Sequence, residues 1–269
     1  MSEHTMVFVG GLHRSGTSLV HRCLASHPDV SGFSGTGVEE DEGQHLQTVY
    51  PPARQHGGPG RFGFDPAAHL TDASPLAGRD ARDRLMSEWG RHWDMTRPVL
   101  VEKSPPNLIR TRFLQEVFPG CRQIVVIRHP IAVACATQKW SWTSYTSLIE
   151  HWLVCHETLL ADLPHVERLM VIRYEDFVAS PDSVLAEAFG FVGVAPRPSG
   201  LAVRADVNDA YFRRFRSNRW NPLKRFDTDR ARDRMTDRVA RFGYSLAAPA
   251  DRGALPPELR SRAAAAVGG

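Results

Sequence analysis

The sequence has few cysteines, little excess charge and no long apolar run, and each absence excludes a class of protein. Four cysteines among 269 residues follow neither a disulfide nor a zinc-ligand spacing, so we expect reduced structural thiols and no metal site. The net charge of +3 gives no reason to expect a nucleic-acid partner. No stretch approaches the about 20 apolar residues that span a membrane, and the first residues show neither the basic nor the apolar segment typical of a leader. We therefore expect a cytoplasmic protein without a membrane partner.

Apolar runs and helical patterns alternate along the chain. Runs typical of buried strands lie at residues 6–10, 98–103, 123–128 and 168–174. Segments with helical periodicity follow them at residues 17–26, 107–117, 130–139, 144–163 and 182–193. Such alternation predicts an α/β fold, with a central parallel sheet flanked by helices. No internal linker is evident, so we expect a single domain over residues 1–269.

Two regions lack this regularity. Residues 33–80 are rich in Gly and Pro, and they predict an irregular insertion that serves as a lid. Residues 249–269 hold few large apolar side chains, so we expect a loosely held tail.

The most informative segment is GGLHRSGTSL at residues 10–19, where a strand turns into a helix. A glycine-rich turn there lets backbone N–H groups surround an anion, and the helix N-terminus adds partial positive charge. Gly11 and Gly16 have the spacing of a nucleotide P-loop, but Thr17 stands where that motif requires Lys. Arg14 instead supplies a planar, permanently charged group suited to phosphate or sulfate oxygens. The segment therefore predicts an anion-binding loop and disfavours a nucleotide triphosphatase.

This loop resembles the 5′-phosphosulfate loop of the sulfotransferases that use 3′-phosphoadenosine 5′-phosphosulfate (PAPS). The stretch GGLHRSGTSLVHRCLASHPDV is especially similar to the bacterial and tyrosylprotein branch, in which an Arg replaces the Lys of the cytosolic branch. The resemblance implies a P-loop-like sulfotransferase fold with PAPS as cofactor. It also implies that the 5′ end of PAPS is bound by Arg14, Ser15, Gly16, Thr17 and Ser18.

A second motif, IVVIRHPIAVACATQKW at residues 124–140, resembles the part of the same family that grips the 3′-phosphate. Arg128 and Pro130 match the family pattern, which makes Arg128 the 3′-phosphate ligand. The family has a serine one or two helical turns later. This sequence has Ala136 at that position, with Thr137 beside it. Either Thr137 supplies the hydroxyl, or Arg128 works with backbone donors and a basic residue from elsewhere.

Three further segments are similar to the family, and the matches together run from Val7 to about Ser245. VIRYEDF resembles the segment whose tyrosine, here Tyr174, lies near the cofactor. EKSP resembles the segment whose lysine, here Lys103, approaches the transferring group. SNRWNPLKRF resembles the loop that closes on the cofactor, with Lys224 as its lysine.

The chemistry assigns roles, because sulfuryl transfer is an in-line displacement in which the protein positions reactants and stabilises charge. Arg14 neutralises the phosphosulfate but cannot give up its proton, so Lys103 is the better acid at the leaving group. The acidic run VEEDEGQH at residues 38–45 offers a base for the acceptor. We favour Glu40, with Glu42 next and His45 as the alternative that is not a carboxylate. Neighbouring carboxylates raise one another's pKa, which suits a base working near neutrality.

The resemblance implies transfer of the sulfuryl group from PAPS to a hydroxyl or amine of a small-molecule or carbohydrate acceptor. A kinase-like phosphotransferase is one alternative, although it requires a loop lysine and depends on a metal ion. A non-catalytic nucleotide-binding protein is another, and it tolerates the loss of Glu40 and Lys103. Trp140 and Trp142 either stack on adenine or an aromatic acceptor, or pack at the end of a helix.

Overall fold

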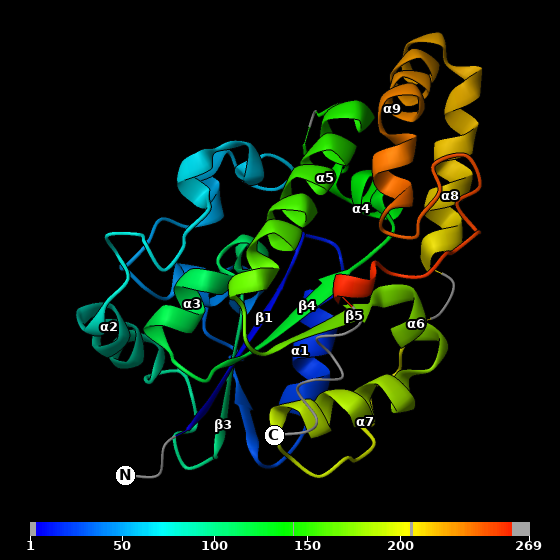
Figure 1. Ribbon diagram of the computed structural model, residues 1–269. Coiled ribbons are helices and arrows are strands. Elements are labelled where there is room, and N and C mark those ends of the chain that lie inside the picture. The colour runs from blue at the N-terminus through cyan, green and yellow to red at the C-terminus, as the bar shows by residue number, and fades with distance from the viewer. Residues whose placement is uncertain (1–3, 142, 205–206, 260–269) are drawn as a thin grey trace.

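The computed structural model describes residues 4–141, 143–204 and 207–259. Within these ranges one five-stranded sheet is surrounded by nine α-helices (Figure 1), which confirms the predicted α/β class. The strands are β1 (Thr5–Gly11), β2 (Val30–Gly32), β3 (Val99–Lys103), β4 (Arg122–Ile127) and β5 (Leu169–Arg173). The helices are α1 (Thr17–Ala25), α2 (Arg79–Trp89), α3 (Thr111–Val117), α4 (Pro130–Thr137), α5 (Tyr145–Asp162), α6 (Tyr174–Ala179), α7 (Pro181–Val192), α8 (Val207–Ser217) and α9 (Pro222–Ala240).

All neighbouring strands are parallel, in the order β2-β3-β1-β4-β5. From β1 the chain first forms the edge strand β2, returns inward to form β3 beside β1, and then crosses to the other side to form β4 and β5. In open sheets of this kind, ligands bind beyond the carboxyl ends of the strands at the point where the order reverses. Here that point is the end of β1. The pairs Val9 with Lys103 and Gly11 with Val126 bring the ends of β3 and β4 to its two sides.

The two faces of the sheet are covered because successive strand residues point to opposite sides. In β1, Val7 and Val9 pack with apolar side chains of α1 and α7. Met6 and Phe8 pack on the other face with side chains of α2 and α3. The strands are therefore buried on both faces, which is why they appear in the sequence as nearly continuous apolar runs.

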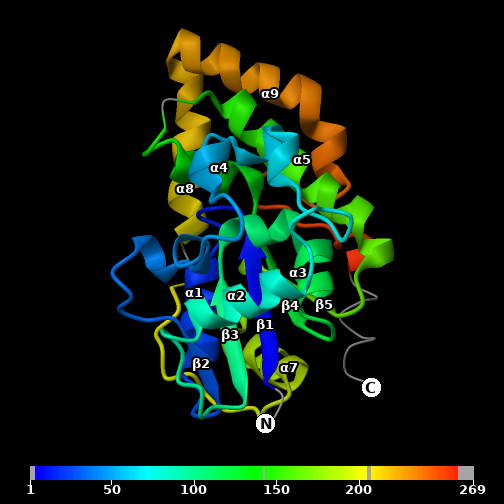
Figure 2. The ribbon, with the colours of Figure 1, turned by 90° about the vertical axis from the view of Figure 1, so that its left-hand side faces the viewer.

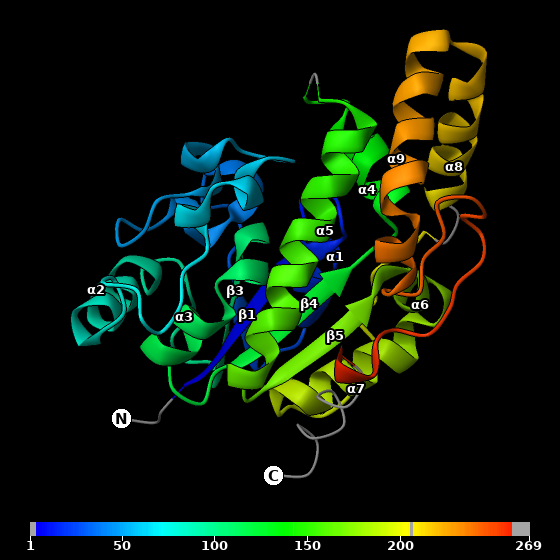
Figure 3. The same cartoon turned by 45° about the horizontal axis from the view of Figure 1, so that its top comes forward.

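Helices α8 and α9 form a hairpin at the same end of the sheet as the loops that follow the strands (Figures 2 and 3). Phe212 and Phe215 of α8 join the apolar cluster of α4 and α5, as does Met235 of α9. Arg238 of α9 also forms ion pairs of 2.7 Å and 2.6 Å with two glutamates of α5, Glu150 and Glu157. The base of the hairpin is thus attached to the body of the protein.

The segment between β2 and α2 contains no α-helix and no strand, and all of its residues are described. It forms five single-turn 3₁₀ helices at Glu39–Asp41, Gly43–His45, Ala53–His56, Phe62–Phe64 and Pro66–Ala68. Side chains replace the missing regular hydrogen bonds. The Oε1 atom of Gln44 accepts from the N–H of Ala53 at 2.8 Å, and Nε2 of Gln47 donates to the carbonyl of Tyr50 at 2.7 Å. The segment is irregular but internally bonded.

The tail is attached along the part that the structure describes. The N–H of Gly253 donates to the carbonyl of Gly243 at 3.0 Å, and Arg173 donates to the carbonyl of Gly253 at 2.8 Å. Leu259 is buried in the main apolar cluster. The remainder of the predicted tail, residues 260–269, lies outside the described residues. Within the described ranges, no helix combines the length and apolar character needed to cross a bilayer.

Candidate active site

The loop between β1 and α1 is packed closely against the strand ends. Gly11 and Gly16 have φ angles of 148° and 107°, which residues with a side chain rarely adopt. A Cβ atom on Gly16 would lie 2.6 Å from the ring of Tyr174, and one on Gly11 would lie 2.5 Å from the carbonyl oxygen of Val126. Arg14 also has a positive φ, of 70°. No larger side chain fits at either glycine without moving the loop.

This loop has the donors and the charge of an anion site. Helix α1 begins at Thr17 with no side-chain cap and no acidic residue in its first turn, so its first N–H groups keep their donor capacity and partial positive charge. The hydroxyl of Ser15 is buried and has no hydrogen-bond partner among the described residues. A buried hydroxyl without a partner is unfavourable unless a ligand or water satisfies it.

Arg128, at the end of β4, lies directly beside this loop. Its Nη1 atom donates to the carbonyl oxygen of Arg14 at 2.9 Å. Its guanidinium lies over the ring of Tyr174, 4.1 Å from the ring centroid. Burial lowers the pKa of Arg128, but an arginine remains protonated in proteins. The two arginines that the sequence assigns to opposite ends of one nucleotide therefore belong to the same site.

A buried network fixes the guanidinium of Arg128. The Oδ1 atom of Asn208 accepts from its Nε and Nη2 atoms at 2.9 Å and 2.6 Å. The side-chain amide of Asn208 donates to Glu175 at 2.8 Å. Glu175 also accepts from the hydroxyl of Tyr244 and from the N–H of His129, each at 2.9 Å. Arg128 is thus held from α8, α6 and the C-terminal segment at once.

The acidic segment, residues 38–45, lies next to the loop between β1 and α1. The carboxylate of Glu40 accepts a hydrogen bond of 3.0 Å from the hydroxyl of Ser18. Glu42 is only 5% exposed; it accepts from Gln44 at 2.5 Å and forms an ion pair of 3.2 Å with Lys103. The ammonium of Lys103 also donates to the carbonyl oxygen of Glu40 at 2.8 Å. One fully buried lysine therefore anchors both glutamates that were predicted as base candidates.

Burial affects the protonation of Glu42 more than repulsion from neighbouring carboxylates does. It raises the pKa of Glu42, while the charge of Lys103 opposes the rise and Glu39 adds to it least. Our expectation of a raised pKa in this run is met at Glu42, but desolvation is the leading cause.

Three histidines near the same place are neutral at physiological pH. Burial, reinforced by the charge of Lys103, lowers the pKa of His13 to about 3 and that of His21 to about 4. Burial and the nearby Arg54 lower the pKa of His45, the alternative base. Neutral imidazoles keep a lone pair, so each can accept a hydrogen bond from a hydroxyl or amine group of a bound molecule.

A single cavity of about 1030 Å³ collects most of the predicted residues. Those that line it are Arg14, Gly16, Thr17, Ser18, Glu40, Glu42, His45, Arg128 and Tyr174. The sequence reasoning had not singled out several other lining residues, among them His13, His21, Arg54 and Tyr211. The carboxylates and the two arginines thus face one space.

Four predicted residues are not among those that line this cavity. Ser15 and Lys103 are buried close to it, under the loop and under the acidic segment. Thr137 is buried and instead borders a separate void of about 10 Å³. Lys224 is exposed in the first turn of α9, at the far end of the hairpin. The structure therefore brings neither Thr137 nor Lys224 to the site.

Trp140 lines the cavity and is 57% exposed. The guanidinium of Arg14 lies 4.6 Å from its ring centroid. This residue does not pack in the core at the end of α4, which was the other interpretation of its position. Trp142, with which it was paired, lies outside the described residues.

Asn208, Tyr211 and Glu175, which surround Arg128, are further residues that the sequence reasoning missed. Asn208 and Tyr211 lie between the motifs VIRYEDF and SNRWNPLKRF and have no pattern that marks them. Glu175 lies inside the Arg-Tyr-Glu-Asp segment, where only the tyrosine was assigned a role. Within the described residues, no cluster of three or more His, Cys, Asp or Glu side chains is arranged to hold a metal ion.

Comparison with known proteins gives one family. The family model described as the sulfotransferase family matches residues 6–198. A sulfotransferase from Alicyclobacillus acidocaldarius is 16% identical, with a TM-score of 0.46 and coverage of 82% of this chain and 96% of that chain. The sulfotransferase domain of the Synechococcus PCC 7002 olefin synthase is 17% identical, with a TM-score of 0.49 and coverage of 79% of this chain and 89% of that chain. The matched residues include the β1–α1 loop, the acidic segment and Arg128, but they end before α8.

Proposed function

Because the chain belongs to the sulfotransferase family, we propose that it transfers the sulfuryl group of PAPS to a hydroxyl or amine of a small-molecule or carbohydrate acceptor. The observation that carries this proposal is the position of Arg14 and Arg128. Both line one cavity at the reversal point of the sheet, and a hydrogen bond of 2.9 Å joins them. A nucleotide with an anionic group at each end of its ribose needs two such cations in a single space.

The residues present fit PAPS. Gly16 lets the loop pack against the ring of Tyr174, where a Cβ atom would clash, and both residues line the cavity. The hydroxyl of Ser15 is a buried donor without a partner among the described residues. We assign Arg14, Ser15, Gly16, Thr17 and Ser18 to the 5′-phosphosulfate. Arg128 and Tyr174 are assigned to the 3′-phosphate and the adjoining nucleoside.

When bound, PAPS supplies the activated sulfuryl group, and the side chains of the protein position the acceptor and stabilise charge. Glu40 is our choice for the group that takes the acceptor proton, because it lines the cavity beside Ser18. Glu42 and His45 are the next candidates. We now assign Lys103 to the support of Glu40 and Glu42 rather than to proton donation, because its ammonium is fully buried and both of its hydrogen bonds go to the acidic segment. We also propose that the protein acts as one domain in the cytoplasm.

Calorimetric titration with 3′-phosphoadenosine 5′-phosphate (PAP), in buffer free of divalent metal, tests cofactor binding. We expect Arg14→Ala and Arg128→Ala each to weaken binding by at least about 1.5 kcal/mol, because each removes a charge-assisted hydrogen bond. Arg79→Ala is the matched control, since Arg79 is exposed at the start of α2. Equal PAP affinity in all four proteins, or a metal requirement for binding, contradicts the proposal.

Transfer itself is tested with labelled PAPS and a panel of alcohols, sugars and amines. We expect Glu40→Gln to reduce the rate by about 10²–10⁴-fold while PAP affinity stays within about twofold of wild type. A non-catalytic nucleotide-binding protein shows no transfer to any acceptor and no difference between the two proteins.

A further inference from the structure

The turn between α8 and α9 holds the three most exposed large apolar side chains among the described residues. We define the hairpin turn as residues 216–226, which join the end of α8 to the start of α9. Trp220, Leu223 and Phe226 are 77%, 84% and 69% exposed, the highest values among the large apolar residues described. Trp140, the next in order, is 57% exposed. Three apolar side chains within seven residues thus face solvent at one place.

The same turn is strongly basic. It contains Arg216, Arg219, Lys224 and Arg225, and no Asp or Glu lies between residues 216 and 226. Over residues 207–240 there are 10 Lys and Arg and 5 Asp and Glu, a net charge of +5. The whole chain has 33 Lys and Arg and 30 Asp and Glu. The residues outside 207–240 therefore include 23 Lys and Arg and 25 Asp and Glu, a net charge of −2. The positive charge of the protein is therefore concentrated in this hairpin.

The nearest carboxylates do not neutralise the turn. Asp227 is directed inward, where its two oxygens accept hydrogen bonds of 2.6 Å and 3.1 Å from the N–H groups of Tyr145 and Thr146. Asp229 is shared between Arg225 and Arg232, at 3.3 Å each. The remaining cations of the turn face solvent.

Folding does not account for this apolar surface. The hairpin buries Phe212, Phe215 and Met235 against α4 and α5, and none of these three residues belongs to the turn. The turn itself projects away from the sheet, beyond the ends of α4 and α5 (Figures 1 and 3). Trp220, Leu223 and Phe226 therefore lie on the projecting end of the hairpin, with shallow hollows beside Trp220 and Phe226.

We propose that the hairpin turn docks on the surface of an anionic lipid bilayer. Exposed apolar side chains on a projecting turn enter the boundary between headgroups and acyl chains, and tryptophan prefers that depth. Arginine and lysine around the turn bind the lipid phosphates, and their side chains reach from apolar to polar surroundings. The bilayer matches both features of the turn, whereas a folded partner must provide a pocket for three separate apolar side chains.

Docking at this place brings the cavity close to the lipid surface. Helix α8 runs from the hairpin turn to the cavity, where Val207 and Tyr211 line its wall. The proposal goes beyond the sulfotransferase activity and does not depend on it. Our sequence-based expectation of no membrane partner considered spanning segments only, and a peripheral contact needs none.

Co-sedimentation of the full chain with vesicles tests the proposal. The probes are vesicles of phosphatidylcholine alone and of equal parts phosphatidylcholine and phosphatidylglycerol. We expect binding to the anionic vesicles only, and weaker binding as salt rises. The triple variant Trp220→Ala, Leu223→Ala, Phe226→Ala is expected to bind at least about tenfold more weakly, as is Arg216→Ser combined with Arg219→Ser and Lys224→Ser.

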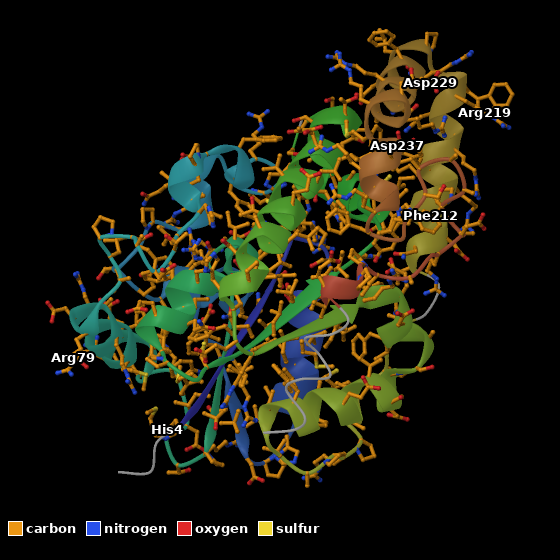
Figure 4. The ribbon with its side chains drawn as sticks, viewed as in Figure 1. His4, Arg79, Phe212, Arg219, Asp229 and Asp237 are labelled. Carbon is orange, nitrogen blue, oxygen red and sulfur yellow. The ribbon has the colours of Figure 1, made fainter. Side chains whose placement is uncertain are left out.

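Matched controls separate the turn from general surface effects. Leu76→Ala with Met95→Ala removes exposed apolar side chains elsewhere, and Arg79→Ser removes a cation at the opposite side of the molecule from Arg219 (Figure 4). Both are expected to bind vesicles as wild type does. Equal binding of the triple variant and wild type, or no binding to anionic vesicles, overturns the proposal. Loss of PAP affinity in the triple variant overturns it in favour of a turn that closes on the cavity. Self-association that the triple variant abolishes overturns it in favour of a second copy of the chain.

Discussion

The floor of the cavity, by which we mean the loop Arg14 to Ser18, Arg128 and the buried Lys103 close to them, and the hairpin turn both contain several cations, but they hold them in opposite ways. Lys103 and Arg128 are 0% and 5% exposed, and each is hydrogen-bonded to at least two groups. The cations of the hairpin turn, by contrast, are exposed around three apolar side chains. A buried charge is stable only when it is paired, so removing its partner has a large effect. An exposed charge interacts mainly with water, and its effect depends on what binds from outside.

The largest expected effect is at Lys103. Lys103→Met leaves Glu42 buried without its ion-pair partner, and we expect a loss of about 3–5 kcal/mol in the free energy of unfolding. The matched control is Lys224→Met, the same chemical change at an exposed position, which should alter stability by less than about 0.5 kcal/mol. Urea denaturation of the three proteins makes the comparison. If both variants lose the same stability, burial does not distinguish the two regions.

A second buried group, the carboxyl of Glu102, makes the free energy of unfolding depend on pH. Glu102 is fully buried between Ser104 and Asn107, which donate hydrogen bonds of 2.5 Å each. Burial raises its pKa from 4.5 to about 7. The folded protein therefore binds more protons than the unfolded chain between these two values, so the free energy of unfolding falls as pH rises. At about 1.36 kcal/mol per pH unit, the fall is about 3 kcal/mol.

Glu102→Gln tests this expectation, because glutamine resembles the neutral carboxyl and does not titrate. Urea denaturation at about pH 5 and about pH 8 should show the variant gaining about 2.5 kcal/mol relative to wild type, because the unfolded chain is already largely ionised at about pH 5. Parallel stability curves for the two proteins would falsify the raised pKa of Glu102.

The difference between the two regions also explains what the sequence could predict. Four of the five strands were expected from apolar runs, whereas Val30–Gly32 is too short to show any period. The cavity floor was predictable because Arg14 to Ser18 are contiguous and Arg128 ends a buried strand. Asn208 was not, because it meets Arg128 across 80 residues of chain and no motif marks it. Lys224 matched a motif by sequence alone, but the hairpin carries it away from the site.

Asn208 is the residue of the hairpin that forms hydrogen bonds with Arg128. It holds Arg128 without lining the cavity, so we expect it to act as a positioning residue for the 3′-phosphate. Asn208→Ala should weaken PAP binding by about tenfold, as for one lost hydrogen bond to a charged group. Binding of adenosine 5′-phosphate, which lacks the 3′-phosphate, should not change. Calorimetry with both nucleotides measures this discrimination.

The neighbouring Asp209→Ala is the control, since Asp209 is exposed on the same helix. A purely structural role for Asn208 predicts equal losses for the two nucleotides. Tighter PAP binding in Asn208→Ala would instead mean that the asparagine oxygen competes with the phosphate for Arg128.

The smallest expected effect is at Lys224 and Trp220. Both lie in the hairpin turn and neither lines the cavity, so Lys224→Ala and Trp220→Ala should change PAP affinity by less than about twofold, because exposed charges are screened and contribute little to sites they do not touch. Titration of each variant with PAP checks this directly. A tenfold loss in either one means that the hairpin moves onto the nucleotide, and the contrast between a buried, preformed floor and a remote basic turn then fails. Retained affinity leaves Asn208 as the contact through which α8 acts on the cavity.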